Sequence, residues 1–180
     1  MKKQVLIISS SPRKGGNSDL LCDEFLKGAT ESGHSAEKIF LKDKVIRYCT
    51  GCGYCSTNNK NICSQVDEMA EILDSMIKSD VIVFATPIYF YTMCGQLKTF
   101  IDRCCAKYSL IKNKEFYFIM TAAATEEHIF DGTLHEFKCF LSCLDNPTIK
   151  GSIKADGVWL MEDVHHTKYL EQAYNMGKNI

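Results

Sequence analysis

The amino-acid sequence predicts an α/β fold in which five parallel strands alternate with five helices. Continuous apolar runs at residues 5–8, 81–85 and 116–120 have the length and composition of strands that are covered on both faces. Apolar residues at helical spacing lie between these runs. Because such alternation is typical of a parallel sheet, we expect a layer of helices on each face.

Each element follows from its local pattern. The strand at 5–8 leads into a polar loop at 9–18, and Leu21, Phe25 and Ala29 then recur at helical spacing until Gly33. A weaker strand is expected at 37–41, and apolar residues from Val66 to Ile77 predict a helix capped by Ser64. The strand at 81–85 follows, then a helix at 97–104, the strand at 116–120, a helix at 134–144, a strand within 149–160 and a terminal helix at 170–177.

Length and composition favour one soluble domain. A chain of 180 residues with 46% hydrophobic residues predicts a single domain over 1–180, with 41–65 as a cysteine-rich insertion loop. The net charge of −1 gives no general attraction to nucleic acid or to an anionic membrane. The apolar runs are far shorter than the roughly 20 residues that span a bilayer, and no signal sequence is recognisable at the start. The expected location is therefore the cytoplasm.

The loop at residues 9–18 has the composition of a phosphate-binding turn. It is rich in serine, contains Gly15 and Gly16, and joins a strand to a helix. A helix N-terminus offers free amide groups and the positive end of its dipole, which suit a phosphate monoester. The alternative is an ordinary polar loop in which Asn17 or Ser18 caps the helix. No Walker A sequence or complete dinucleotide fingerprint occurs in the chain.

Two further loops should meet this one, because ligands of such sheets bind beyond the carboxyl ends of the strands. The loop after 81–85 holds Pro87 and three successive aromatics from Tyr89 to Tyr91, which either cover the core or face a flat apolar ligand. The loop that begins at Thr121 has small side chains that allow a ligand edge to approach closely. The sequence thus predicts a cavity with a phosphate end and a planar end.

Four of the ten cysteines form the sharpest local pattern: Cys49, Cys52, Cys55 and Cys63. Three thiols at x2 spacing can reach three corners of one iron–sulfur cubane, with the fourth ligand farther along. A zinc site, a redox disulfide and a thiol loop without metal are the alternatives. The other cysteines lie in or beside apolar helical patterns and are expected to be buried in the core: Cys22, Cys94, Cys104, Cys105, Cys139 and Cys143.

Three segments carry a resemblance to a known family. S-P-R-K-G-G-N-S at 11–18, T-P-I-Y-F-Y-T-M-C-G-Q-L-K-T-F-I-D-R at 86–103 and Y-L-E-Q-A-Y-N-M-G-K at 169–178 are similar to the NADPH-dependent FMN reductase family, including its iron–sulfur flavoprotein branch. The similarity extends over essentially the whole chain. It implies a flavodoxin-like three-layer sandwich with a five-stranded parallel sheet in the order 2-1-3-4-5.

The resemblance also implies roles for individual residues. Ser9, Ser11, Arg13, Asn17 and Ser18 would hold the FMN phosphate. The isoalloxazine would be lined by Pro87, Ile88, Tyr89, Phe90 and Tyr91, and its other edge would touch Thr121, Ala122, Ala123 and Ala124. The compact motif of the iron–sulfur branch matches the four cysteines, which would hold a [4Fe–4S] cluster. Members of the family are typically homodimers or tetramers with the flavin near the subunit interface.

The leading hypothesis is therefore an FMN-dependent oxidoreductase. It would pass electrons from NAD(P)H, or from ferredoxin, to a quinone, a flavin or another small acceptor. No catalytic acid or base is required, and the five histidines are expected at the surface. The alternatives are an iron–sulfur or zinc-binding electron-transfer or regulatory module without flavin catalysis, and a scaffold that has lost its ligand.

Overall fold

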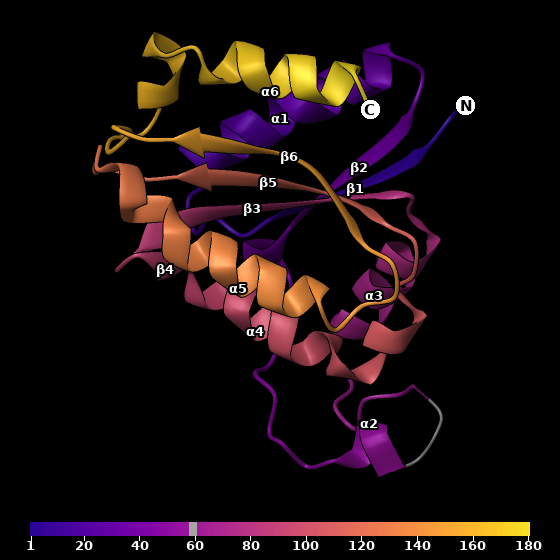
Figure 1. Ribbon diagram of the computed structural model, residues 1–180. Coiled ribbons are helices and arrows are strands. Elements are labelled where there is room, and N and C mark those ends of the chain that lie inside the picture. The colour runs from indigo at the N-terminus through magenta and orange to yellow at the C-terminus, as the bar shows by residue number, and fades with distance from the viewer. Residues whose placement is uncertain (58–60) are drawn as a thin grey trace.

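The chain folds into three layers, with a central sheet between two groups of helices (Figure 1). The structure is a computed structural model that describes residues 1–57 and 61–180. Helices α1 (Asn17–Glu31) and α6 (Tyr169–Lys178) cover one face of the sheet. Helices α3 (Met69–Lys78), α4 (Gly95–Arg103) and α5 (Asp131–Leu141) cover the other. The predicted α/β class is confirmed.

Five parallel strands form the sheet in the order β2-β1-β3-β5-β6. They are β1 (Gln4–Ser9), β2 (Ser35–Phe40), β3 (Val81–Tyr89), β5 (Glu115–Thr121) and β6 (Thr148–Ala155). A sixth strand, β4 (Thr92–Met93), pairs antiparallel with the end of β3. The sequence does not predict β4, because a two-residue strand carries no periodicity of its own.

Short helices complete the described chain. One α-helical turn, α2, covers Tyr54–Thr57. The 3₁₀ turns are η1 (Leu41–Asp43), η2 (Cys104–Ala106), η3 (Tyr108–Leu110), η4 (Glu127–Phe130) and η5 (Asp163–His166). No helix in these described residues is both long and apolar enough to cross a membrane.

The strand alternation divides the core into two halves. On β1, Leu6 and Ile8 pack toward α3, α4 and α5, whereas Val5 and Ile7 pack toward α1 and α6. All four side chains are at most 2% exposed. Burial on both faces explains why β1, β3 and β5 read as continuous apolar runs in the sequence.

Close backbone contact joins α1 to α6. A Cβ at Gly28 would lie 2.1 Å from the Tyr174 carbonyl oxygen, and one at Gly177 would lie 2.1 Å from that of Phe25. Both distances are far below any allowed contact, so only glycine fits at these crossing points. The C-terminal helix is thereby held against the helix whose N-terminus begins at the polar loop.

The helix after the cysteine-rich segment begins later than predicted. Ser64 is not its N-cap and Val66 lies outside it at 93% exposure, since α3 starts only at Met69. The carboxylate of Asp67 binds Arg103 and that of Glu68 binds Lys44, so both residues hold the preceding loop.

Half of the cysteine burial prediction is wrong as well. Cys22, Cys94 and Cys104 are buried, whereas Cys105, Cys139 and Cys143 are exposed. Cys139 lies on the outer face of α5, whose core side carries Phe137 and Leu141, and Cys143 follows the end of that helix.

Candidate functional site

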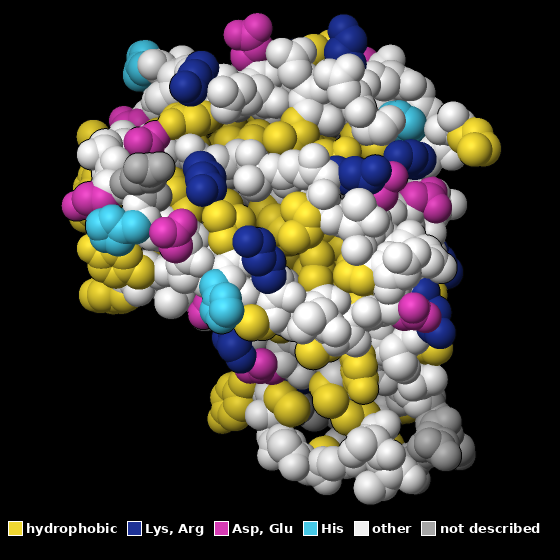
Figure 2. All heavy atoms as spheres, in the orientation of Figure 1, with side chains coloured by type: hydrophobic (Ala, Val, Ile, Leu, Met, Phe, Trp, Pro, Cys, Tyr) yellow, Lys and Arg dark blue, Asp and Glu magenta, His cyan; other side chains and the backbone are white. Residues whose placement is uncertain are grey.

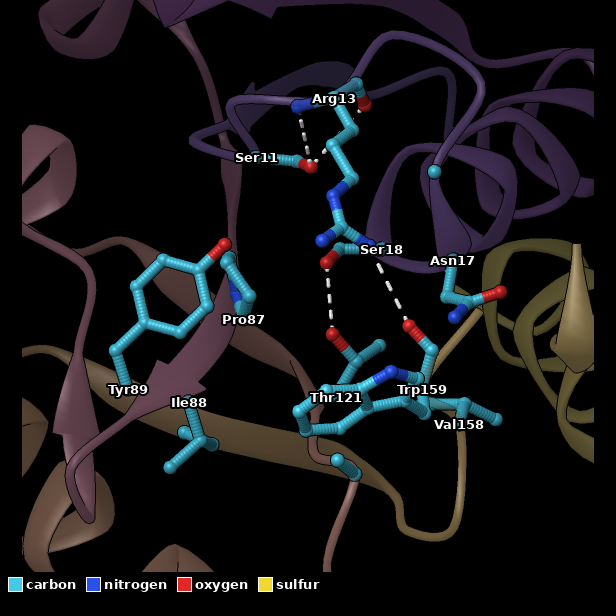
Figure 3. A pocket seen from close by; sticks show the side chains of 12 residues that line it. Ser11, Arg13, Asn17, Ser18, Pro87, Ile88, Tyr89, Thr121, Val158 and Trp159 are labelled. Carbon is cyan, nitrogen blue, oxygen red and sulfur yellow. Dashed lines mark hydrogen bonds between the residues drawn. The ribbon is translucent and has the colours of Figure 1, made fainter. Parts of the chain in front are cut away.

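A cavity of about 220 Å³ lies beyond the carboxyl ends of β1, β3 and β5 (Figure 3). The three loops that the sequence predicts to converge all contribute to its wall, together with the loop that follows β6. Its lining residues are Ser11, Arg13, Gly16, Asn17, Ser18, Pro87, Ile88, Tyr89, Thr121, Ala123, Val158 and Trp159.

The 9–18 loop is fastened from behind by buried polar contacts. The Ser10 hydroxyl donates to the Ala85 carbonyl oxygen at 2.6 Å, which ties the loop to β3. Asp19 is 3% exposed, and its carboxylate accepts hydrogen bonds from the Ser9 hydroxyl and the Gly15 amide. Lys38 pairs with the same carboxylate at 2.8 Å. These buried contacts hold the loop in one conformation without a ligand.

The start of α1 presents free amide groups to the cavity. Gly16 is the N-cap and has no side chain with which to satisfy the first turn. Among the hydrogen bonds of the described residues, none uses the amides of Asn17 and Ser18. These amides and the positive end of a 15-residue helix form an arrangement that favours an anion.

Arg13 and Asn17 hold the loop that follows β6. One guanidinium nitrogen of Arg13 donates to the Trp159 carbonyl oxygen at 3.3 Å. The Asn17 side chain donates to the Leu160 carbonyl oxygen at 2.8 Å and accepts from the Val164 amide at 3.2 Å. Both polar ends of Asn17 are therefore occupied, whereas Arg13 keeps further donors for another partner.

The planar end of the cavity comes from β3. Pro87, Ile88 and Tyr89 line it, and Figure 3 places Tyr89 across the opening from Trp159. Burial raises the pKa of Tyr89, although Arg13 opposes the rise, so its hydroxyl remains a neutral hydrogen-bond donor at physiological pH.

The hairpin between β3 and β4 turns the next two aromatics outward. Phe90 and Tyr91 have φ values of 51° and 66°, the left-handed conformation of a tight hairpin turn. Phe90 is 97% exposed and Tyr91 is 51% exposed, and neither lines the cavity. A left-handed backbone is costly for aromatic residues, and such strain is concentrated at functional sites.

The third wall is the loop after β5. The Thr121 hydroxyl lies 2.8 Å from that of Ser18, and Ala123 lines the cavity beside it. Ala122 is buried, and its carbonyl oxygen accepts from the Val158 amide at 2.9 Å. This backbone pairing continues the sheet beyond β6 and carries Val158 and Trp159 into the site.

The structure brings most of the predicted flavin residues together, but not all. Five lie outside the cavity wall: Ser9, Phe90, Tyr91, Ala122 and Ala124. Ser9 points toward Asp19, and Ala124 packs against the core on the α5 side. Gly16 of the predicted phosphate-binding turn lines the cavity, as do Val158 and Trp159, which are not predicted from the sequence although the single tryptophan is a usable signal. No histidine lines it, and all five histidines lie outside the buried core.

The four cysteines of the x2 pattern occupy a segment that projects away from the sheet (Figures 1 and 2). Cys49 and Cys52 are exposed, whereas Cys55 and Cys63 are partly buried. Residues 58–60 of the predicted 41–65 insertion lie outside the described part of the chain. Within that part, no three cysteine, histidine or acidic side chains are gathered closely enough to hold a metal ion.

Arg103 anchors the base of this segment. Its guanidinium binds both carboxylate oxygens of Asp67, at 2.7 and 2.9 Å, with both side chains at most 2% exposed. It also donates to the Arg47 carbonyl oxygen at 2.6 Å. Asp67 is the main cause of the raised pKa of Arg103, and the nearby Cys63 adds to it.

The cavity fits FMN better than the cysteine segment fits an iron–sulfur cluster. The cavity combines a rigid anion-binding turn with an apolar slot, which matches a phosphate joined to a planar ring. At the cysteine segment, the donors are thiols alone, and the buried Nε of Arg103 has no hydrogen-bond partner among the described residues. A cation beside Cys63 suits an anionic thiolate cluster, but the thiols would have to move together to bind one.

Comparison with known proteins identifies the family. The sequence profile of the NADPH-dependent FMN reductases matches residues 3–155. The chain belongs to this family. An iron–sulfur flavoprotein of Archaeoglobus fulgidus is 43% identical over 96 residues, which are 53% of this chain and 43% of that protein. The chain spans about half the length of the curated relatives it matches.

Solved structures of other FMN reductase-like proteins confirm the flavodoxin-like fold. An NAD(P)H:quinone oxidoreductase from Methanothermobacter marburgensis superposes with a TM-score of 0.79 at 18% identity, covering 99% of this chain and 96% of that one. An FMN-dependent NADH-azoreductase from Bacillus anthracis, solved in complex with FMN, gives 0.68 at 15% identity over 98% and 96%. Identities this low establish the shared fold alone.

Proposed function

We propose that the protein is an FMN-dependent oxidoreductase that takes electrons from NAD(P)H and delivers them to a small acceptor such as a quinone or a free flavin. The observation that carries the proposal is the convergence of the 9–18 loop, residues 87–89 and residues 121–123 on one cavity. Membership of the FMN reductase family supports the same cofactor. The proposed activity is that of the domain formed by residues 1–180.

The phosphate end is the part of the site with the clearest chemistry. FMN would supply hydride and single-electron transfer, which no side chain of the cavity offers. The amides of Asn17 and Ser18 and the hydroxyls of Ser11 and Ser18 would hold its phosphate, with Arg13 adding positive charge. Ser9 has no part in this proposal, because it lies outside the cavity wall and its hydroxyl donates to the buried Asp19.

Binding a whole FMN requires the loop after β6 to yield. The cavity of about 220 Å³ is smaller than the roughly 300 Å³ at the lower end of ligand sites. Arg13 and Asn17 close it by hydrogen bonds to carbonyl oxygens at residues 159 and 160. We propose that a phosphate replaces the Trp159 carbonyl as the partner of Arg13, and that the indole then shifts to form one wall of the ring site.

The apolar end would orient the ring and keep water from it. Pro87, Ile88 and Tyr89 form a wall whose backbone is held by strand pairing, Pro87 with β5 and the other two with β4. Ala123 leaves room at the opposite edge. A donor or acceptor would reach the exposed face of the ring from the side that Phe90 and Tyr91 border. Flat molecules such as quinones and nicotinamides would fit this approach better than bulky substrates.

The decisive experiment is an anaerobic ultraviolet–visible titration. Protein reconstituted with FMN and freed of excess should show flavin absorbance, and NADPH or NADH should bleach it with one hydride per flavin. A quinone added afterwards should restore the band. Reduced ferredoxin serves as the alternative donor in a parallel sample. Protein that neither retains FMN nor is stabilised against heat by it would reject the proposal.

We further propose that Cys49, Cys52, Cys55 and Cys63 bind a [4Fe–4S] cluster. Their spacing, the thiol-only donor set and the iron–sulfur flavoprotein relative support it. The unpartnered Nε of Arg103 would face a cluster sulfur near Cys63. Iron and sulfide should be measured after anaerobic reconstitution, with Cys63→Ser expected to lose iron and Cys139→Ser expected to keep it. Zinc, or no metal, in the wild type would contradict the cluster.

We also propose a homodimer that uses the rim of the cavity. Phe90 and Tyr91 on the hairpin and Leu160 and Met161 on the neighbouring loop are each more than half exposed. Exposed apolar side chains gathered at one edge are typical of an interface. Light scattering should give twice the chain mass, and Phe90→Asp should give a monomer. A monomeric wild type at micromolar concentration would refute this interface.

A further inference from the structure

A fifth thiol lies beside the four-cysteine pattern although it is far away in the sequence. Cys105 belongs to η2, directly after α4, and its Sγ lies 3.8 Å from the Sγ of Cys55. Cys105 is thus in direct contact with one of the four predicted cluster ligands.

The fold holds this approach in place. Arg103 lies two residues before Cys105 and is fixed by its buried pair with Asp67 and by its bond to the Arg47 carbonyl. Those contacts tie both ends of the cysteine segment to the end of α4. Because Cys105 continues from the same helix end, the contacts of Arg103 also set the position of Cys105 relative to the segment.

No other pair of cysteines in the described part of the chain makes such a contact. Cys94 and Cys104 are buried and donate to the backbone oxygens of Ser10 and Phe100. Cys143 donates to the Cys139 carbonyl oxygen just beyond the end of α5. Among the described residues, the contact between Cys55 and Cys105 is the one hydrogen-bonding contact that joins two thiols. Cys105 is exposed and Cys55 partly so, which leaves the pair open to small solutes.

We propose that Cys55 and Cys105 form a reversible disulfide when a peroxide is present. The sulfurs must close from 3.8 Å to the roughly 2.05 Å of a disulfide, a shift that one exposed turn of α2 can supply. One thiolate attacks hydrogen peroxide, takes one oxygen and releases water, which gives a sulfenic acid. The second thiol attacks that sulfur and releases a second water. Two thiols thereby lose two electrons and two protons, and one peroxide becomes two waters.

The Cys55–Cys105 disulfide and the proposed cluster would exclude one another. It consumes Cys55, so a chain with this disulfide cannot offer all four thiols to a cluster, and a bound cluster protects Cys55 from peroxide. This mutual exclusion rests on the cluster proposed above, whereas the disulfide itself does not. The pair would then act as an oxidation-sensitive gate on cluster assembly.

The test uses flavin-reconstituted protein that has been treated with a chelator. Hydrogen peroxide is added, free thiols are alkylated, and the chain is digested without reductant. We expect one intrachain disulfide, a mass lower by two hydrogens, and reversal by dithiothreitol. Cys104 and Cys105 share one tryptic peptide, as do Cys49, Cys52 and Cys55, so substitutions must assign the pair. Cys55→Ser and Cys105→Ser should each abolish the link.

Matched controls decide between neighbouring thiols. Cys143→Ser removes an exposed thiol that borders the same apolar groove as Cys105. Cys104→Ala removes the sequence neighbour of Cys105. Both variants should still form the link between Cys55 and Cys105. A link that survives in Cys105→Ser, or one that forms between chains, would overturn the proposal.

A second arm separates this inference from the cluster. Protein loaded anaerobically with iron and sulfide should resist disulfide formation in proportion to its iron content. Full linkage at full iron content would overturn the mutual exclusion. If the chain binds no iron, the cluster proposal fails, and the disulfide stands or falls on the chelator-treated sample alone.

Discussion

The cavity and the cysteine segment are both built from loops, but they differ in how the fold holds them. The 9–18 loop is fastened along its length by Ser10 and Asp19, whose polar atoms are buried. The cysteine segment is fastened mainly at its base, by Arg103, and its thiols are exposed or half-buried. The 9–18 loop is therefore held in place without a ligand, whereas the thiols of the cysteine segment would have to move together to bind a cluster.

The largest effect should come from breaking the anchor of the cysteine segment. Asp67→Asn leaves the Arg103 guanidinium buried without a counter-charge, which should lower the free energy of unfolding by about 3–5 kcal/mol. Urea denaturation measures this difference. Asp102→Asn removes an exposed pair with Lys98 and should change stability by less than about 0.5 kcal/mol. Equal effects of both variants would show that Arg103 is no special anchor.

The same pair predicts how stability depends on pH. Burial alone would raise the pKa of Asp67, but hydrogen bonds from Arg103 and from the Arg47 and Met69 amides outweigh it and lower the pKa. A lowered folded-state pKa contributes stability above the unfolded value of about 4, which is lost as the pH falls through the folded value. Wild type and Asp67→Asn should therefore converge in stability below about pH 4. A constant gap between them down to the lowest pH would contradict the pair.

A smaller effect is expected at the phosphate loop. Asp19→Asn removes the charge that holds Lys38 and leaves poorer acceptors for the Ser9 hydroxyl and the Gly15 amide. The cost should be about 2–3 kcal/mol of unfolding free energy, with FMN affinity roughly tenfold weaker. Asp23→Asn is the matched control, since Asp23 binds the same lysine but is 51% exposed. If Asp23→Asn weakens FMN binding and Asp19→Asn does not, then Asp23 and not Asp19 supports the phosphate loop.

Two neighbouring cations offer a sharper test of the cavity. Arg13→Ala should weaken FMN binding by roughly 10- to 100-fold, the range for a charge-assisted hydrogen bond. Lys14 is in the same loop, but its side chain is 79% exposed and outside the cavity wall. Lys14→Ala should therefore change the affinity by less than about threefold. Equilibrium dialysis with FMN measures both, and equal losses would indicate charge attraction without a specific site.

The sequence predicts the parts of the fold that obey one simple period. β3 and β5 are buried on both faces, so their apolar runs mark them directly. The start of α3 could not be predicted, because Asp67 and Glu68 serve long-range partners, Arg103 and Lys44, that no local pattern contains. Local periodicity describes what an element buries, whereas its ends depend on contacts across the fold.

The candidate site shows the same division. Residues 87–89 and Thr121, which the sequence predicts as loop residues, are the last residues of β3 and β5, and the rule on strand ends is enough to place them. The family resemblance implies that Ser9, the first residue of the predicted 9–18 loop, holds the phosphate, yet Ser9 is still part of β1 and its hydroxyl donates to Asp19. Trp159 enters the site through the pairing of Val158 with Ala122, a contact across 36 residues that the sequence does not reveal.

The smallest effect is expected at an exposed thiol. Cys52→Ser, in protein without metal, should change the free energy of unfolding by less than about 0.5 kcal/mol, because Cys52 is exposed and a serine hydroxyl can keep its contact with Ser64. Denaturation in the presence of a chelator measures it. A loss above about 1 kcal/mol would show that the cysteine segment is organised before any metal binds.

Tryptophan fluorescence tests most directly whether FMN occupies the cavity beside the 9–18 loop. Trp159 is the only tryptophan in the sequence, and it lines that cavity. Titration with FMN should quench tryptophan fluorescence to saturation at one flavin per chain, and Trp159→Phe should still retain flavin on a desalting column. Retention of FMN by the wild type with unchanged Trp159 emission would place the flavin elsewhere and contradict the account.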